Sequence, residues 1–269
     1  MFKESILAGK TAFISGGTSG INLGIAKALA QHGASVAVIG RNPERGEAAA
    51  AEIREAGAPT SLFFSVDVRD YDAVNQAMKD TVAQTKSLDI VIAGAAGNFF
   101  APAVDISPNG FKTIVDIDLL GTYHVFRAGF DHCSKPGSSF IAITAPQAVN
   151  PTPLQAHVCA AKAGVNALLK TLAMEWGPAG VRVNGIAPGL TGDTEGLKRL
   201  FATDPEGGQK MIDALPIRRL GEVRDIGDAA IYLSSEVGKY VNGTVIDVDG
   251  GYQLGDASLD CLTSSKKKP

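Results

Sequence analysis

The segment KTAFISGGTSGIN, residues 10–22, decides the fold. A short apolar run ends at a cluster of glycines, and helical periodicity begins near Ile21. This order predicts a strand that turns directly into a helix. Glycines at positions 16 and 20 permit a tight turn and let backbone N–H groups approach an anion, toward which the helix directs its positive end. The segment therefore predicts a pyrophosphate-binding turn in a βαβ unit.

The rest of the chain continues this alternation of apolar strands and helices. The strand-like segments are residues 10–15, 35–40, 61–66, 88–93, 139–144, 181–186 and 244–248. The segments with helical pattern are residues 21–32, 43–56, 70–85, 108–132, 154–176 and 223–234. Strands that are apolar throughout and separated by helices indicate a parallel sheet covered on both faces. We expect an α/β fold: a single doubly wound, Rossmann-like domain over residues 1–269, with a mostly parallel seven-stranded sheet.

Two segments fall outside this pattern. Residues 189–220 form one long irregular stretch, which is typical of a lid or binding segment, here a substrate lid. Residues 256–269 are expected to be a flexible C-terminal tail, whose lysine run is a solvated terminus.

Composition excludes several classes of protein. The chain has 269 residues, is 45% hydrophobic and 20% charged, and has a net charge of −3. It is too apolar to be disordered, and it lacks the excess of basic residues that is typical of a nucleic-acid-binding protein. Three cysteines and four histidines show no metal-ligand spacing, so no metal is expected. No membrane span is expected. The sequence ends in Lys268-Pro269 and not in a peroxisomal targeting tripeptide, so a cytoplasmic location is expected.

The end of the second predicted strand selects the nucleotide. An acidic residue there would bind the ribose hydroxyls of NAD, but this strand ends in Gly40-Arg41-Asn42. The guanidinium of Arg41 suits a ribose 2′-phosphate, so NADP is the expected cofactor. The alternative is that Arg41 is a solvated surface residue.

Several motifs along the chain resemble the short-chain dehydrogenase/reductase superfamily. The turn resembles its TGxxxGxG pattern, with Ser15 in place of Thr and Asn22 in place of the third Gly, so Asn22 must fit sideways or contact the cofactor itself. The other matching motifs are Asp67-Val68, Gly94-Ala95-Ala96-Gly97, Arg182-Val183-Asn184, Pro188-Gly189 and Asp249-Gly250-Gly251. The resemblance implies NADP(H) contacts from Gly16, Thr18, Ser19, Gly20, Ile21, Asn22, Arg41, Asp67, Val68, Ala95, Gly97, Lys162, Pro188, Gly189, Leu190 and Thr191.

The usual acid–base residues of the superfamily are incomplete. Lys162 is the lysine of its YxxxK motif, but Val158 stands at the Tyr position and Ala145 at the Ser position. An alcohol dehydrogenase needs an acid there to protonate the nascent alkoxide. Three interpretations remain: a non-catalytic NADP-binding protein, proton transfer by His157 or Thr144, or reduction of a conjugated acyl thioester, whose negative charge is delocalised.

Further residues are similar to the 2,4-dienoyl-CoA reductases of the peroxisomal type, notably Gln155-x-His157 and an Asp at position 118. The resemblance implies NADPH-dependent reduction of a 2,4-dienoyl-CoA, with Lys162 holding the nicotinamide ribose and Asp118 placing the proton-delivering water. The alternative for Asp118 is that its side chain only forms a hydrogen bond at a kink in the helix. Asp249 either takes part in the same catalytic network or only stabilises the turn before Gly250-Gly251. The resemblance also implies an acyl-CoA substrate and a homotetramer; another acyl-thioester or carbonyl reductase is the alternative. The residues expected to contact substrate are Asn98, Phe99, Phe100, Gln147, His157 and Thr194.

Overall fold

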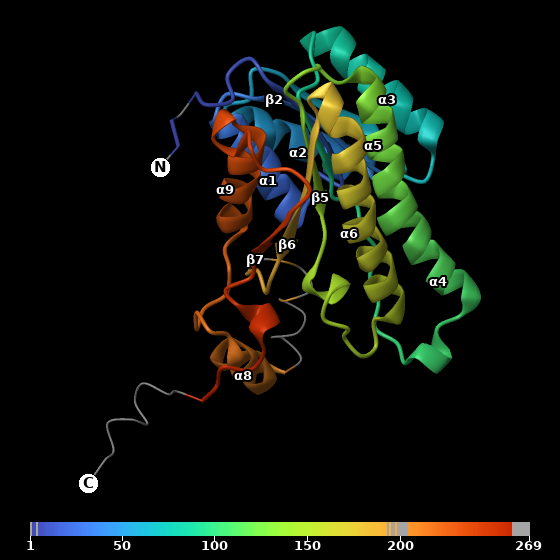
Figure 1. The fold of residues 1–269 in the computed structure, drawn as a ribbon, viewed down its shortest axis with the longest axis vertical. Helices are drawn as coiled ribbons and strands as arrows, with labels where there is room; N and C mark the ends of the chain where they lie inside the picture. The colour runs from blue at the N-terminus through green and yellow to red at the C-terminus, as the bar shows by residue number, and fades with distance from the viewer. Residues whose placement is uncertain (1, 4, 193, 195–196, 198–203, 260–269) are drawn as a thin grey trace.

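Seven strands form one sheet at the centre of the molecule (Figure 1). The computed structural model describes residues 2–3, 5–192, 194, 197 and 204–259. The strand order is β3-β2-β1-β4-β5-β6-β7, and every neighbouring pair is parallel, which confirms the expected fold class. The strands are β1 (Thr11–Ser15), β2 (Ser35–Gly40), β3 (Ser61–Ser65), β4 (Ile90–Ala93), β5 (Ser139–Ile143), β6 (Arg182–Pro188) and β7 (Val245–Val248).

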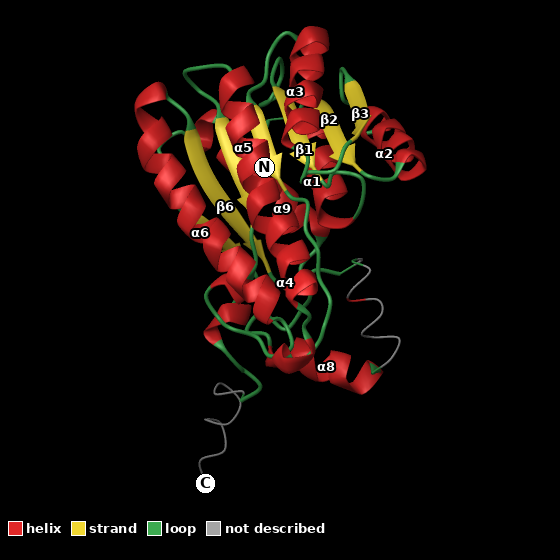
Figure 2. Ribbon diagram, turned by 90° about the vertical axis from the view of Figure 1, so that its right-hand side faces the viewer, coloured by secondary structure: helices red, strands yellow, loops and turns green. Residues whose placement is uncertain are grey.

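Helices cover both faces of the sheet, as Figure 2 shows. Helices α1, α2 and α9 pack on one face, and α3, α5 and α6 pack on the other. The helices are α1 (Gly20–Gln31), α2 (Pro43–Glu55), α3 (Tyr71–Thr85), α4 (Pro108–Val115), α5 (Gly121–His132), α6 (Ala156–Trp176), α8 (Pro205–Ala214) and α9 (Val223–Ser234).

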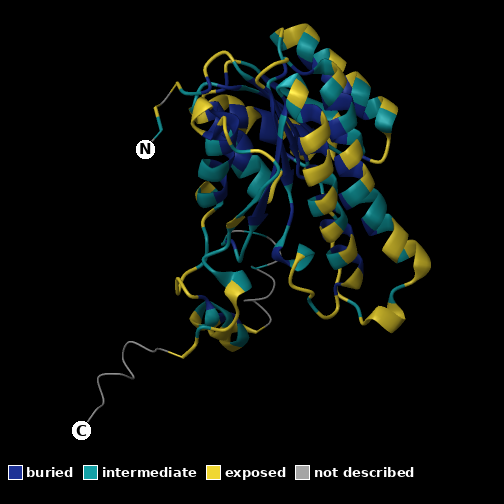
Figure 3. Ribbon diagram, in the orientation of Figure 1, coloured by how far each residue is buried: buried dark blue, intermediate teal, exposed yellow. Residues whose placement is uncertain are grey.

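Alternating side chains of the strands divide the core into two layers. In β1, Phe13 packs in the layer under α3, α5 and α6, whereas Ala12 and Ile14 pack in the layer under α1 and α9. All five residues of β1 are buried, and Figure 3 shows the sheet as the buried centre of the molecule. The strands of such a sheet have continuous apolar sequences, because both faces of the sheet are covered.

The helix expected over residues 108–132 contains an interruption. Between α4 and α5, residues Asp116–Leu120 form a single π-helical segment, so the predicted uninterrupted α-helix is wrong at this point. A π turn adds one residue to a helical turn and so changes the direction of the side chains that it carries. Here the side chain of Asp118 is fully buried.

The stretch 189–220 is not irregular throughout, because it contains α8. Asp204 caps this helix by accepting a hydrogen bond from the N–H of Gly207, and Pro205 occupies its first turn. These are ordinary start signals, but Gly207 and Gly208 weaken the helical pattern. Most of residues 193–203 lie outside the described residues, as do residues 260–269 of the expected tail.

The sheet order places a crevice between β1 and β4. From β1 the chain crosses to one face of the sheet, and the helices that follow β4 lie on the other. Ligands of doubly wound folds bind where the strand order reverses, at the carboxyl ends of the strands. No helix in the described part of the chain is both long and apolar enough to pass through a bilayer.

Candidate active site

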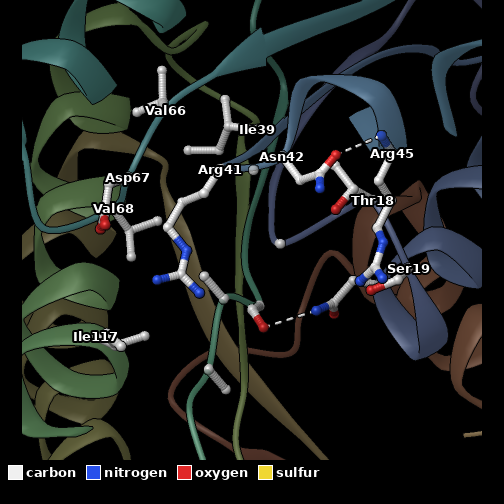
Figure 4. Close-up of a pocket in the computed structure, with 16 residues that line it drawn as sticks. Thr18, Ser19, Ile39, Arg41, Asn42, Arg45, Val66, Asp67, Val68 and Ile117 are labelled. Carbon is white, nitrogen blue, oxygen red and sulfur yellow. Dashed lines mark hydrogen bonds between the residues drawn. The ribbon is translucent and has the colours of Figure 1, made fainter. Parts of the chain in front are cut away.

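A cavity of about 440 Å³ opens at the reversal point of the sheet (Figure 4). It is formed by the ends of four neighbouring strands, β1 to β4, and by the loops that follow them. A cavity of this size and position suits part of a dinucleotide. Of the expected cofactor contacts, those that line it are Gly16, Thr18, Ser19, Asn22, Arg41, Asp67, Val68 and Ala95. Those outside this lining are Gly20, Ile21, Gly97, Lys162, Pro188, Gly189, Leu190 and Thr191.

The glycine turn lies directly against the loop after β4. Gly16 has a φ of +70°, and a Cβ atom on it would lie 2.8 Å from the Cα of Ala95. The hydroxyl of Ser15 accepts hydrogen bonds from the N–H groups of Gly94 and Ala95, at 3.0 and 3.2 Å. Ser15 therefore ties the two loops together, a role that the motif alone did not indicate.

The side chain of Asn22 bonds to the loop after β4 and leaves one buried polar atom without a partner among the described residues. Its Nδ2 donates to the carbonyl of Gly94 at 2.8 Å, so the side chain spans the space that a glycine would leave open. Its Oδ1 is buried and has no hydrogen-bond partner among the described residues, and the residue lines the cavity. A buried acceptor without a partner costs free energy unless a ligand or water supplies a donor, so the cavity fits a hydrogen-bonding cofactor.

Two arginines border the cavity beyond the end of β2. Arg41 lies directly after the strand, and Arg45 comes from the first turn of α2. Arg45 was not predicted from the sequence, because Arg41 precedes α2 and only the fold places both residues at one cavity. Figure 4 shows the guanidinium of Arg45 beside Ser19 and that of Arg41 on the side of Val68, so the cavity carries positive charge in two places, which favours a ligand with phosphate groups.

An acidic residue also borders this rim. Asp67 forms a 2.6 Å ion pair with Arg69. Hydrogen bonding from Arg69 lowers the pKa of Asp67, with a smaller contribution from the charge of Arg41. The carboxylate is therefore ionised and fixed at neutral pH.

Lys162 and Asp118 form a buried ion pair near the ends of β4 and β5. The Nζ of Lys162 lies 3.2 Å from Oδ2 of Asp118 and donates to the carbonyl of Ile143 at 3.0 Å. The Oδ1 of Asp118 accepts from the N–H of Gly97 at 2.7 Å. The structure thus brings together the two residues expected to be catalytic, and Asp118 is the buried residue of the π segment.

Neither Val158, at the usual tyrosine position, nor the nearby Thr144 can act as the proton donor. Val158 is buried against Ile114 and Ala161, and the hydroxyl of Thr144 donates to Asn166 at 2.8 Å. Proton transfer by Thr144 is therefore disfavoured, because its proton is already committed.

His157 is fully buried, and both of its ring nitrogens lack a partner among the described residues. Its ring stacks on Phe99 with a centroid separation of 4.1 Å. This geometry favours a structural role for the ring.

The remaining expected substrate contacts lie in two groups. Asn98 and Gln147 are joined through Gln155, at 3.1 and 3.3 Å, while Phe100 is 70% exposed beside them. Thr194 lies apart, with its hydroxyl donating to the carbonyl of Thr191 at 3.0 Å.

Asp249 accepts from the N–H groups of Gly251 and Gln253, which favours the turn interpretation for that residue. No group of three or more metal-ligating side chains occurs in the part of the chain that the structure describes.

The parallel sheet, the glycine turn and the cavity at the reversal point define a dinucleotide-binding protein of the Rossmann class. The family model described as enoyl-(acyl carrier protein) reductase matches residues 16–253. The chain belongs to the short-chain dehydrogenase/reductase family, whose members are oxidoreductases with a nicotinamide cofactor.

Within this family, the chain is similar to proteins named as 2,4-dienoyl-CoA reductases. The chain is 41% identical to a peroxisomal 2,4-dienoyl-CoA reductase of Saccharomyces cerevisiae, over 93% of this chain and 86% of that protein. It is 39% identical to the peroxisomal enzyme of Arabidopsis thaliana, over 94% and 87% of the two chains. A solved structure from Sinorhizobium meliloti, described as that of a short-chain alcohol dehydrogenase by assignment, is 30% identical, with a TM-score of 0.87 over 94% of this chain and all of that one.

These relatives also correct one expectation. The yeast, Arabidopsis and rat proteins are all named as peroxisomal, which contradicts the cytoplasmic location expected from the sequence. That expectation rested on Lys268-Pro269, which lie outside the described residues.

Proposed function

We propose that this protein reduces 2,4-dienoyl-CoA thioesters with NADPH and yields an enoyl-CoA. The names of the relatives support this substrate class. The observation that carries the proposal is the buried pair Lys162–Asp118 beside a site in which Val158 and Ala145 replace the usual hydroxyl donors. Such a site lacks the acid that an alkoxide needs, yet it retains the charged groups that a delocalised anion and an ordered water can use.

The cavity supports NADPH over NADH. Arg41 and Arg45 provide two cations at the rim, and the strand end lacks the acid that would bind free ribose hydroxyls. When bound, the cofactor supplies the hydride. Lys162 holds the ribose next to it and adds a positive charge, while Asp118 fixes Lys162 and orders the water that delivers the proton.

Two further features belong to this proposal. Residues 1–269 act as one catalytic domain, and the described residues of the segment 189–220 contribute to the substrate site. The protein assembles as a homotetramer, because Leu120, Tyr123 and Met174 leave apolar surface on the helices, with exposed fractions of 44%, 41% and 80%. Closed symmetric assembly commonly buries such surface.

A thioester panel tests the function. Purified protein is mixed with NADPH or NADH and with a 2,4-dienoyl-CoA, a 2-enoyl-CoA, acetoacetyl-CoA or a simple ketone, and oxidation is followed by absorbance. We expect turnover of the dienoyl-CoA with NADPH and almost none of the ketones. Turnover of acetoacetyl-CoA or the ketone without turnover of the dienoyl-CoA would show a carbonyl reductase instead. No turnover of any substrate, with NADPH still bound, would indicate a non-catalytic protein.

A further inference from the structure

A second cavity lies at the opposite edge of the sheet from the cofactor cavity. Its volume is about 400 Å³, and its lining includes Lys10, which directly precedes β1, and Arg182, the first residue of β6. These residues lie at the amino ends of the strands, whereas the cavity of Figure 4 lies at the carboxyl ends. The two cavities are therefore separated by the length of the sheet, and the proposed reaction gives the second cavity no role.

Positive charge predominates in the lining of this second cavity. Lys10, Arg182 and Lys239 all line it, and Glu236 is the one carboxylate among the described residues of the lining. Within the part of the chain that the structure describes, none of these three cations forms an ion pair. Lysine and arginine side chains that converge without carboxylate partners are suited to a phosphate group.

Arg182 is held at the carboxyl end of α9. Its Nη1 and Nη2 donate to the carbonyls of Val241 and Leu233, at 3.3 and 2.6 Å, and Leu233 lies in the last turn of the helix. Near the end of α6, the carbonyl of Ala173 accepts from Asn242, which also lines the cavity. These carbonyl groups, which contribute to the negative ends of the two helices, are thus already bonded within the protein.

The positive charge of the cavity therefore exceeds what the protein itself uses. Burial lowers the pKa of the Arg182 guanidinium, and the charge of Glu236 opposes this effect in part, but the group stays protonated at neutral pH. The side chains of Lys10 and Lys239 donate to no group among the described residues. Two such cations beside a partly desolvated guanidinium attract an anion more strongly than cations surrounded by water, because the local dielectric constant is lower.

A buried hydroxyl in the same lining has no partner. Ser234, the last residue of α9, is 3% exposed, and its Oγ forms no hydrogen bond among the described residues. A buried hydroxyl of this kind costs free energy unless a water or a ligand supplies a partner. Phosphate oxygens are strong acceptors, so a phosphate in the cavity would satisfy the hydroxyl and the cations together.

We propose that this cavity is a second ligand site that binds a phosphate group, with charge supplied by Lys10, Arg182 and Lys239 and a hydrogen bond by Ser234. The phosphate is either inorganic or part of a nucleotide, whose base would stack on the fully exposed ring of Tyr240 in the same lining. The site is independent of the proposed reaction, because none of its residues lines the cofactor cavity.

Calorimetric titration of the protein saturated with NADP⁺ tests the site. NADP⁺ is added first so that it occupies the cofactor cavity, and inorganic phosphate or ADP is then titrated at constant ionic strength. We expect saturable binding of inorganic phosphate by the wild type. Tighter binding of ADP would identify a nucleotide as the source of the phosphate, and equal or weaker binding of ADP would identify inorganic phosphate.

The combined substitution Lys10→Gln and Lys239→Gln tests the charges. It removes the two cations that have no partner, and it should weaken phosphate binding by about tenfold to a hundredfold. NADPH affinity, measured by fluorescence, should be unchanged. Lys79→Gln combined with Lys170→Gln is the matched control, because it removes two exposed lysines on α3 and α6 and should not alter phosphate binding.

Ser234→Ala tests the hydroxyl. It should weaken phosphate binding by about fivefold to tenfold, and it should not lower the melting temperature without phosphate, because the hydroxyl has no partner to lose. Ser61→Ala is the matched control. The Oγ of Ser61 is also buried but donates to the carbonyl of Ala50 at 2.7 Å, so this substitution should lower the melting temperature and leave phosphate binding unchanged.

Three results would contradict the proposal. Absence of saturable binding of both phosphate and ADP by the wild type would overturn the site. Full binding by the lysine variant would show that the ligand binds elsewhere, and neither Lys10 nor Lys239 is buried, so this variant should fold. Full phosphate binding by Ser234→Ala, or a melting temperature lowered as in Ser61→Ala, would overturn the role of the hydroxyl.

Discussion

The Nζ of Lys162 and the Oδ2 of Asp118 lie 3.2 Å apart, with side-chain exposures of 7% and 0%. The two charges are therefore largely removed from water. A buried pair of this kind gains little net stability over apolar residues, but removal of one partner is costly because the other charge is left uncompensated. The pair thus links catalysis to stability.

Lys162→Ala should affect both properties. We expect turnover to fall by about 10²–10⁴, the usual contribution of a positioned acid–base group. We also expect a loss of about 3–5 kcal/mol of unfolding free energy, because Asp118 is left alone in the interior. Adding Asp118→Asn should restore most of the stability and none of the activity. Thermal unfolding and dienoyl-CoA kinetics measure the two effects.

The exposed pair Lys27–Glu52 is the control for this experiment, with its charges 2.9 Å apart. Lys27→Ala should cost less than about 1 kcal/mol, since exposed pairs contribute little. If Lys162→Ala cost no more stability than Lys27→Ala, the buried pair would not carry an uncompensated charge.

Arg41 and Arg45 should set the preference for NADPH. Arg41→Ala and Arg45→Ala should each weaken NADPH binding by roughly tenfold to a hundredfold, the equivalent of about 1.5–3 kcal/mol for a charged hydrogen bond. NADH binding should hardly change, because NADH lacks the 2′-phosphate. Fluorescence titration gives both affinities. Arg54→Ala, at the far end of α2, should alter neither; equal affinity of the wild type for the two cofactors would contradict the assignment.

Most of the fold could be predicted because its signals are local. Helix α9 begins and ends where the hydrophobic pattern indicates, at Val223 and Ser234, and β2 likewise spans residues 35–40. Continuous apolar strands separated by capped helices admit few arrangements other than a doubly wound sheet.

The parts that were missed depend on tertiary contacts or on weak helix formers. Residues 116–120 have an ordinary helical composition, and what accompanies their π turn is the burial of Asp118 against Lys162, which is distant in sequence. Helix α8 was missed because Gly207 and Gly208 have low helix propensity. Arg45 was missed because only the folded turn brings it to the same cavity as Arg41.

The sequence predicts those residues of the candidate site that lie in recognisable motifs. Lys162 and Asp118 were named separately, and the structure shows that they touch. The partners of Asn98 were not predictable, because the bond to Gln155 joins a loop after β4 to the residue preceding α6, and no local pattern encodes that contact.

The protein should behave as a tetramer in solution. Multi-angle light scattering at micromolar concentration should give about four times the chain mass of 27.8 kDa, as closed symmetry allows. Leu120→Glu, on the π segment beside α5, should shift this mass downward by placing a charge in the proposed contact between subunits. Ala83→Glu, exposed on α3, is the control and should leave the mass unchanged. A monomeric wild type would reject the assembly.

The imidazole of His157 should contribute through its ring and not through its nitrogens. Both nitrogens are buried without partners among the described residues, and the ring stacks on Phe99. His157→Phe should therefore raise the melting temperature and retain turnover, because an unpaired buried polar atom costs about 1–3 kcal/mol. His132→Phe is the matched control. Its Nε2 lies 2.8 Å from Oδ1 of Asn75, so that substitution breaks a hydrogen bond and should lower the melting temperature. A comparable drop in His157→Phe would show that the His157 nitrogens bind a partner, and loss of turnover at unchanged stability would place them in the reaction.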